Sequence, residues 1–149
     1  MTDYKKGSHT IYTIQLHVVW ITKYRYHILK ERVADRAREL IRQICQRNHV
    51  LIITGHMEPD HVHLLVSVPP TLAPSKLMQY IKGASSRRLL EEFPDLSKRY
   101  WGQHLWGVGY FCASAGTVTD DMIKEYIAHH REETPRDRFS IAGEPGADS

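Results

Sequence analysis

The chain has 149 residues and a formal net charge of +3, with 42% hydrophobic and 25% charged residues. This balance is typical of a globular protein in water, and the length suits one domain because two halves would have poor cores. No apolar run approaches the roughly 20 residues of a membrane span, and the polar segment 1–8 does not look like a secretory signal. We therefore expect a cytoplasmic protein with no membrane partner. Cys45 and Cys112 lie in apolar patterns, which favours buried free thiols over a zinc site.

The first half of the chain predicts a strand, a helix and a hairpin. Residues 11–22 alternate between apolar and polar side chains, which indicates a half-buried strand. Residues 31–48 repeat apolar side chains at helical spacing. Two strand-like runs, 50–57 and 61–68, are joined by the turn signal Glu58-Pro59-Asp60 and should form a hairpin.

The second half predicts a helix, a strand and another helix. Pro74 and Pro94 bracket a helix over 74–92. An aromatic-rich loop should then lead into a glycine-interrupted strand over 105–114. A final helix should begin at a threonine and end before a proline. Its expected limits are Thr117 or Thr119 and Glu133.

The resulting order, β-α-β-β-α-β-α, fits an α+β fold of the split βαβ type, which is ferredoxin- or RRM-like. Two helices would cover one face of a mostly antiparallel sheet, and a C-terminal helix would follow. We expect one domain over residues 1–134. The polar segment 135–149 contains two glycines and a proline, so we expect a disordered tail there.

Two histidines stand in the sequence Pro59-Asp60-His61-Val62-His63-Leu64-Leu65. At positions i and i+2 of a strand, His61 and His63 point to the same face. Two imidazoles on a rigid strand form half of a preformed metal site. The same spacing also fits two polar-face residues without a function.

The last predicted helix supplies a reactive group. Tyr126 and His130 are four residues apart and therefore project from one helix face, one turn from each other. Tyr126 can equally be a core aromatic, and residues 129–131 can be a cationic helix end that complements the helix dipole. The spacing alone leaves both interpretations open.

Taken together, five segments resemble the compact single-tyrosine HUH transposases of bacterial insertion sequences (IS200/IS605-like), where HUH means His-hydrophobic-His. The segments are HVVWITKYRY, GHMEPDHVHLL, YIKGASSRRL, LWGVGYFCASAG and IKEYIAHH. They occur in the family's order and spacing, from about residue 12 to residue 130. The resemblance implies that His61 and His63 bind a metal and that Tyr126 is the nucleophile.

His130 departs from the family pattern, which usually has Gln four residues after the tyrosine. The resemblance makes His130 the third metal ligand and implies a divalent cofactor, Mg or Mn. Imidazole is a good ligand for Mn, Co, Ni or Zn and a poorer one for Mg, which prefers oxygen. The substitution therefore leaves the identity of the metal open.

By this resemblance the chain is a DNA transposase that cleaves and rejoins single-stranded DNA at insertion-sequence ends. Tyr126 would take the 5′ phosphate as a covalent ester, and the metal would neutralise the phosphate oxygens. The ester conserves the bond energy, so no ATP is needed, and no GxxxxGK[ST] loop occurs in the chain. The expected partners are single-stranded DNA with hairpins and a second copy, in a homodimer that pairs one subunit's tyrosine helix with its partner's histidines.

Basic residues near the sheet and second helix are candidate DNA contacts. One cluster lies in the predicted helix 74–92, and a second follows the first strand beside tyrosines that could stack on bases. Either cluster can also be a solvated surface. The candidates are Lys76, Lys82, Arg87 and Arg88 in the helix, and Lys23 and Arg25 after the strand.

Three other functions compete with transposition. A nickase of the replication or conjugation type shares the histidine pair and the tyrosine, but such enzymes usually carry extra domains. A non-catalytic single-stranded nucleic-acid-binding module would place exposed aromatics in the central strands, where this chain has His61 and His63. A nucleotide hydrolase with alternating histidines needs a third one at the position of Leu65.

Overall fold

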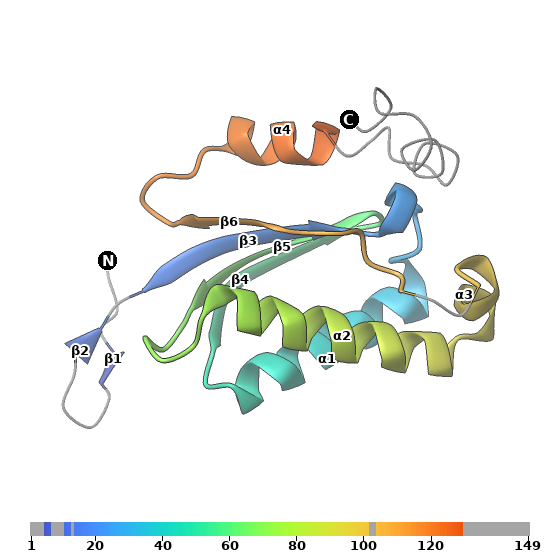
Figure 1. The fold of residues 1–149 in the computed structure, drawn as a ribbon, viewed down its shortest axis with the longest axis horizontal. Coiled ribbons are helices and arrows are strands. Elements are labelled where there is room, and N and C mark those ends of the chain that lie inside the picture. The colour runs from blue at the N-terminus through green and yellow to red at the C-terminus, as the bar shows by residue number, and fades with distance from the viewer. Residues whose placement is uncertain (1–4, 7–10, 13, 102–103, 130–149) are drawn as a thin grey trace, which may run out of the picture.

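An antiparallel sheet with the strand order β4-β5-β3-β6 forms the centre of the computed structural model, which describes residues 5–6, 11–12, 14–101 and 104–129 (Figure 1). Each strand of this sheet pairs with a neighbour far from it in sequence or across a tight hairpin. The strands are β3 (Gln15–Ile21), β4 (Leu51–Glu58), β5 (His61–Ser67) and β6 (Phe111–Ser114).

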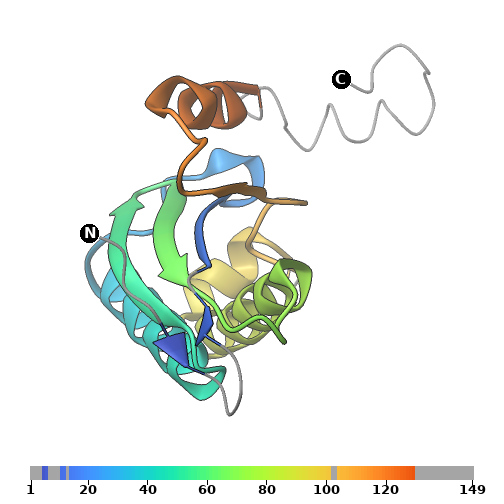
Figure 2. The same ribbon diagram turned by 90° about the vertical axis from the view of Figure 1, so that its left-hand side faces the viewer.

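Helices flank the sheet on both sides. The helical elements are α1 (Glu31–Arg47), α2 (Pro74–Glu92), α3 (Pro94–Arg99), α4 (Asp120–His129) and the 3-10 turn η1 (Lys23–Arg25). α1 and α2 lie side by side on one face, and α4 lies over the other (Figures 1 and 2). A separate two-stranded ribbon, β1 (Lys5–Lys6) with β2 (Ile11–Tyr12), precedes the sheet. The predicted α+β class and the hairpin of β4 and β5 are confirmed. The strand predicted over residues 11–22 is divided, because Ile11–Tyr12 belongs to the separate ribbon and only Gln15–Ile21 joins the main sheet.

The alternation of side chains along the strands decides which face meets α1 and α2. Val18 and Trp20 of β3 and Val62 and Leu64 of β5 are buried in the main core together with the inner faces of both helices. Their neighbours in sequence point to the opposite face, because successive side chains of a strand alternate. Val19 on that second face is also fully buried. The sheet is therefore covered on both sides along β3.

The stretch predicted as one strand over 105–114 is divided. Only Phe111–Ser114 forms the edge strand β6, and Trp106 makes an isolated bridge with Thr22. Gly109 has φ +84°, a left-handed conformation that interrupts the extended chain between these two pairings. The strand prediction was therefore too long because glycine spacing does not reveal where the ladder breaks.

Other limits agree more closely. α2 has the predicted bounds, and Thr119 begins α4, since its Oγ1 accepts a hydrogen bond from the Met122 amide at 3.3 Å. The short helix α3 occupies part of the stretch predicted to be loop. The proposed tail and the domain limit at residue 134 lie outside the described residues. Among the helices that the structure describes, none has the length and apolarity to cross a bilayer.

The cysteines are free thiols, but their surroundings differ. Cys45 is buried in α1, and burial raises the pKa of its thiol to about 11. Cys112 on β6 is only half-buried. The expectation of free thiols is confirmed for both, and that of full burial for Cys45 alone.

Candidate active site

His61 and His63 project from β5 on the face opposite the main core. Their position follows from register, because Val62 and Leu64 between and beside them are buried toward α1 and α2. On the neighbouring strand β3, Ile21 lies opposite His61 and Val19 lies opposite His63. Both histidines are half-buried and share one face, as predicted.

A third imidazole, from His17 of β3, meets this pair. His17 Nδ1 lies 2.8 Å from His63 Nε2, a hydrogen bond in which one ring donates and the other accepts. The ring centroids are 5.1 Å apart and the planes are tilted by 43°. Sequence reasoning placed His17 on the polar face of its strand without giving it a role. The antiparallel pairing of β3 with β5, which brings it beside His63, could not be deduced from spacing within one strand.

β4 extends the polar surface toward the sheet edge. His56 lies opposite His63, and Glu58 lies opposite His61, so both share the face of the histidine pair. Glu58 Oε2 is 2.5 Å from His56 Nε2, and both side chains are largely exposed. Imidazoles and a carboxylate from three strands are thus gathered on one half of the sheet.

Asp60, the last residue of the β4–β5 turn, is only 6% exposed. Its Oδ1 lies 2.9 Å from His61 Nδ1, and its Oδ2 accepts hydrogen bonds from Arg25 Nε at 2.9 Å and Nη2 at 2.6 Å. Burial alone would raise the pKa of this carboxyl, but the hydrogen bonds from His61 and Arg25 outweigh burial and lower it. Asp60 is therefore a carboxylate with a partner on each oxygen.

Burial also changes the pKa of the His17 and His63 imidazoles. Desolvation lowers the pKa of His17 and of His63, and the neighbouring histidines lower that of His63 further. Asp120, in the first turn of α4, acts on both rings in the opposite direction. The neutral form is the one that can bind a metal, and the surroundings of His63 favour it near neutral pH.

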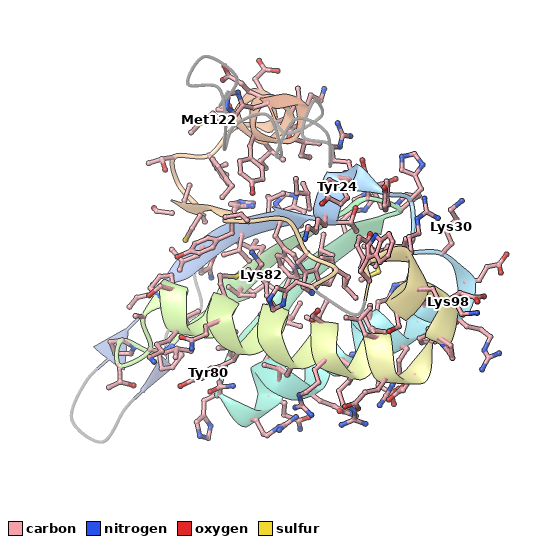
Figure 3. All side chains as sticks on the ribbon, turned by 45° about the vertical axis from the view of Figure 1, so that its right-hand side comes forward. Tyr24, Lys30, Tyr80, Lys82, Lys98 and Met122 are labelled. Atoms are coloured by element: carbon pink, nitrogen blue, oxygen red, sulfur yellow. The ribbon has the colours of Figure 1, made fainter. Side chains whose placement is uncertain are left out.

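Tyr126 belongs to α4, and this helix passes above the sheet on the face opposite α1 and α2 (Figure 3). Its ring packs on Phe111 of β6 with centroids 5.9 Å apart, and its hydroxyl oxygen is shielded from solvent. Phe111 lies opposite Val19, which in turn lies opposite His63. Phe111, on which Tyr126 packs, therefore lies about two strand spacings, roughly 10 Å, across the sheet from His63.

The expected third ligand, His130, lies outside the described residues. Within the described part of the chain, no three His, Cys, Asp or Glu side chains are grouped closely enough to hold a metal ion. The donor set still fits a partial metal site, because the bond from His61 Nδ1 to Asp60 leaves Nε2 of that ring available. A complete site needs a ligand from elsewhere.

The basic residues predicted to contact DNA lie in two places, on α2 and at the end of the sheet where β3 leads into η1. Arg87 and Arg88 are exposed on α2, on the side away from the histidines, and Arg88 lies 3.4 Å from Glu92. Lys76 is exposed on the same helix. Lys82 Nζ donates to the carbonyl oxygens of Gly107 and Gly109, each at 2.8 Å, and thereby supports the loop before β6.

The second cluster lies at the histidine end of the sheet. Lys23 Nζ lies 5.4 Å from the centroid of the Tyr24 ring, whereas the Arg25 guanidinium forms an ion pair with Asp60. Arg99 lies 4.2 Å from the centroid of Tyr26, which adds a cation to this aromatic group. The histidine end therefore combines stacking surfaces with positive charge.

A groove of about 560 Å³ lies between α1 and the β4–β5 hairpin. Val62 and Leu64 line it, so it opens on the side of the sheet opposite His61 and His63. Its other lining residues combine apolar side chains with Arg38, Arg42, Gln46 and His56, and it contains neither the histidine pair nor Tyr126. We therefore locate the candidate chemistry on the open face under α4.

Comparison with known proteins identifies the family of the chain. Residues 10–130 match the family described as "Transposase IS200 like". The ISDra2 transposase TnpA of Deinococcus radiodurans is 36% identical over 125 residues, which cover 84% of this chain and 89% of the relative. The IS200 transposase of Salmonella typhimurium is 33% identical over 133 residues, covering 89% of this chain and 87% of the relative.

Solved structures share the fold. A Deinococcus radiodurans R1 protein assigned as a transposase superposes with a TM-score of 0.76 at 33% identity, over 85% of this chain and 97% of that one. A REP-associated tyrosine transposase bound to a REP hairpin gives 0.53 at 14% identity, over 84% and 68%, which shows similarity of fold alone. The chain belongs to the IS200-like transposase family and is a DNA-processing enzyme.

Proposed function

We propose that this transposase cleaves and rejoins single-stranded DNA through a covalent bond between Tyr126 and a 5′ phosphate. His61 and His63 would hold a divalent cation, with His130 as a further ligand. The substrate would be DNA with a hairpin near the insertion-sequence end, in keeping with the hairpin bound to the REP-associated relative. The metal, Mg or Mn, would neutralise the phosphate oxygens.

The observation that supports this proposal most strongly is that Tyr126, His61 and His63 lie on the same face of the sheet. Tyr126 and the two histidines are far apart in sequence, yet all three lie on the side of the sheet that α1 and α2 leave uncovered. A core role alone would not require imidazoles and a phenol to share that side. A reaction at one phosphodiester does require it.

The chemistry is an exchange of phosphate esters. The Tyr126 oxygen forms a bond to phosphorus, the bond from phosphorus to the 3′ oxygen breaks, and the phenolic proton leaves as the 3′ hydroxyl gains one. Tyrosine has an ordinary pKa of about 10, so attack at neutral pH needs a nearby positive charge or base. Rejoining reverses these steps with the 3′ hydroxyl of another strand, and no ATP is consumed.

We further propose a homodimer in which α4 of one subunit serves the histidines of its partner. The packing of α4 supports this, since Ile123 is the one buried side chain among the residues Asp120–His129. Gly116 in the preceding connection has open space around it. A weakly attached helix on a short connection can be exchanged between copies with little loss of packing.

Incubation with radiolabelled single-stranded DNA from the element ends and Mn²⁺, followed by denaturing electrophoresis, tests the proposal. Wild-type protein should give a protein–DNA adduct, and Tyr126→Phe should give none while it retains DNA affinity. Tyr80→Phe is the matched control, because Tyr80 is exposed on the far side of the sheet. DNA binding without any adduct in the wild type would indicate a binding module, and cleavage without rejoining would indicate a nickase.

A further inference from the structure

We propose that Asp60, itself held by Arg25, is a positioning residue that fixes the ring orientation and proton position of His61. This inference deepens the proposed function, because it explains how one imidazole of the pair is prepared to bind a cation. It gives a new role to Asp60, which the sequence predicts to be part of a turn, and to Arg25, which the sequence predicts to contact DNA.

Each oxygen of the Asp60 carboxylate has a hydrogen-bond partner, either His61 or Arg25. One oxygen faces His61 Nδ1 at 2.9 Å, and the other receives both Nε and Nη2 of Arg25. The Asp60 side chain is 8% exposed and that of Arg25 is 23% exposed, so solvent screens the pair only weakly. His27, with its Nε2 at 4.0 Å from the same oxygen, is largely exposed and contributes little. A buried carboxylate with these contacts has no freedom to turn away from His61.

The consequence for His61 concerns its two ring nitrogens. A carboxylate accepts and cannot donate, so Nδ1 must carry the proton that lies between His61 and Asp60. A neutral imidazole has one proton, and Nε2 therefore presents a lone pair. An imidazole without such a partner in water prefers the proton on Nε2, which would block that nitrogen. Asp60 thus selects the form that can bind a metal through Nε2.

The turn η1 is built to bring Arg25 to this carboxylate. Tyr24 and Arg25 have φ values of 60° and 54°, a left-handed conformation that is unfavourable for residues with a side chain. The turn is tied to Asp60 by the backbone hydrogen bond from the Thr22 amide to the Asp60 carbonyl, at 2.9 Å. Thr22 Oγ1 also donates to the Tyr26 carbonyl at 2.7 Å. These bonds hold the left-handed turn in a shape from which the guanidinium reaches Asp60.

The test uses the full chain without metal and then with Co²⁺. Nitrogen-15 NMR of the metal-free protein at neutral pH should show His61 with its proton on Nδ1, and Asp60→Ala should move the proton toward Nε2. Calorimetric titration with Co²⁺ should show affinity roughly 10- to 100-fold weaker in Asp60→Ala. Asp60→Asn, which keeps an acceptor but loses the charge, should fall between, and Arg25→Gln should weaken affinity less than Asp60→Ala.

Asp35→Asn is the matched control, because Asp35 is an exposed residue of α1 that forms an ion pair with Arg38. It should alter neither the His61 proton nor the Co²⁺ affinity. If Asp60→Ala does not fold, Asp60→Asn and Arg25→Gln carry the test, with circular dichroism as the check on folding. An unchanged His61 proton position in folded Asp60 variants would overturn the proposal. A wild type that binds no Co²⁺ would instead contradict the metal role in the proposed function, while the NMR result would still decide the role of Asp60.

Discussion

The two faces of the central sheet are made by the same strands but have different chemistry. Toward α1 and α2, β5 presents Val62 and Leu64, which are almost completely buried. Toward α4 it presents His61 and His63, which remain half-exposed beside His17. Alternate residues of one strand thus serve the core and the candidate site. Neighbouring substitutions should therefore have separable effects on stability and on chemistry.

The largest effect is expected for His63→Ala. Loss of this imidazole removes a proposed ligand, and the several kcal/mol of charge stabilisation that a metal supplies correspond to at least about a thousand-fold in cleavage rate. The melting temperature should change little, because His63 lies outside the main core. Cleavage of labelled DNA and thermal unfolding measure the two quantities. A rate near that of the wild type would contradict a catalytic role for this face.

Leu64→Ala, at the next residue, should lower the stability of the protein and leave its chemistry unchanged. Leu64 is 5% exposed in the main core, and removal of a buried leucine costs about 2–5 kcal/mol of unfolding free energy. The fraction that stays folded should cleave DNA at the wild-type rate. Urea unfolding gives the free energy, and active-site titration normalises the rate. A large loss of rate per folded molecule would show that the two faces are not independent.

Gly107→Ala tests how tightly the second face is packed. A Cβ at Gly107 would lie 2.9 Å from Ile21 Cγ1, closer than such atoms normally approach. The loop or the Ile21 side chain must shift, at a cost of about 1–3 kcal/mol. Ile21 lies opposite His61, so Co²⁺ affinity should fall as well. Gly83→Ala is the control, because an added Cβ there meets no atom within 4 Å. Equal stabilities of the two variants would disprove tight packing at Gly107.

The smallest effect is expected for Arg36→Gln on the outside of the helical layer. Arg36 makes a two-point contact with Glu92, at 2.7 and 2.9 Å, across α1 and α2. The pair is exposed to solvent, which screens it, so the melting temperature should fall slightly at low salt and not measurably at high salt. A salt-independent loss of stability would indicate that this contact does more than join two helix surfaces.

Much of the fold could be predicted from periodicity. The limits of α2 were predicted to the residue, because Pro74 and Pro94 fix φ and exclude backbone donors at both ends. The alternation of β3 correctly separated Val18 and Trp20 from His17. The division of the segment 105–114 was missed, since it depends on pairing with Thr22 and on the backbone of Gly109.

The site could be predicted only as far as local spacing reaches. An i and i+2 pair determines that His61 and His63 share a face, but not that His17 meets them from another strand. The sequence predicts a DNA contact at Arg25, because a basic residue beside tyrosines is typical of such surfaces. Its partner Asp60 is 35 residues away in sequence, and only the folded turn η1 brings the two together. The roles predicted for Tyr126 and the histidine pair stay predictions until the adduct is measured.

β4 forms an outer margin of the sheet, and it carries the exposed side chains Leu51 and Ile53, at 46% and 37%. A straight edge strand has unpaired backbone groups with which a strand of another chain can pair, and such pairing can lead to fibrous aggregates. The register of β4 shifts between Ile52 and Thr54, which makes Ile53 the extra residue of a bulge in this strand. A foreign strand could therefore match only part of β4. This irregularity should help the protein stay dispersed at the concentrations reached during overexpression.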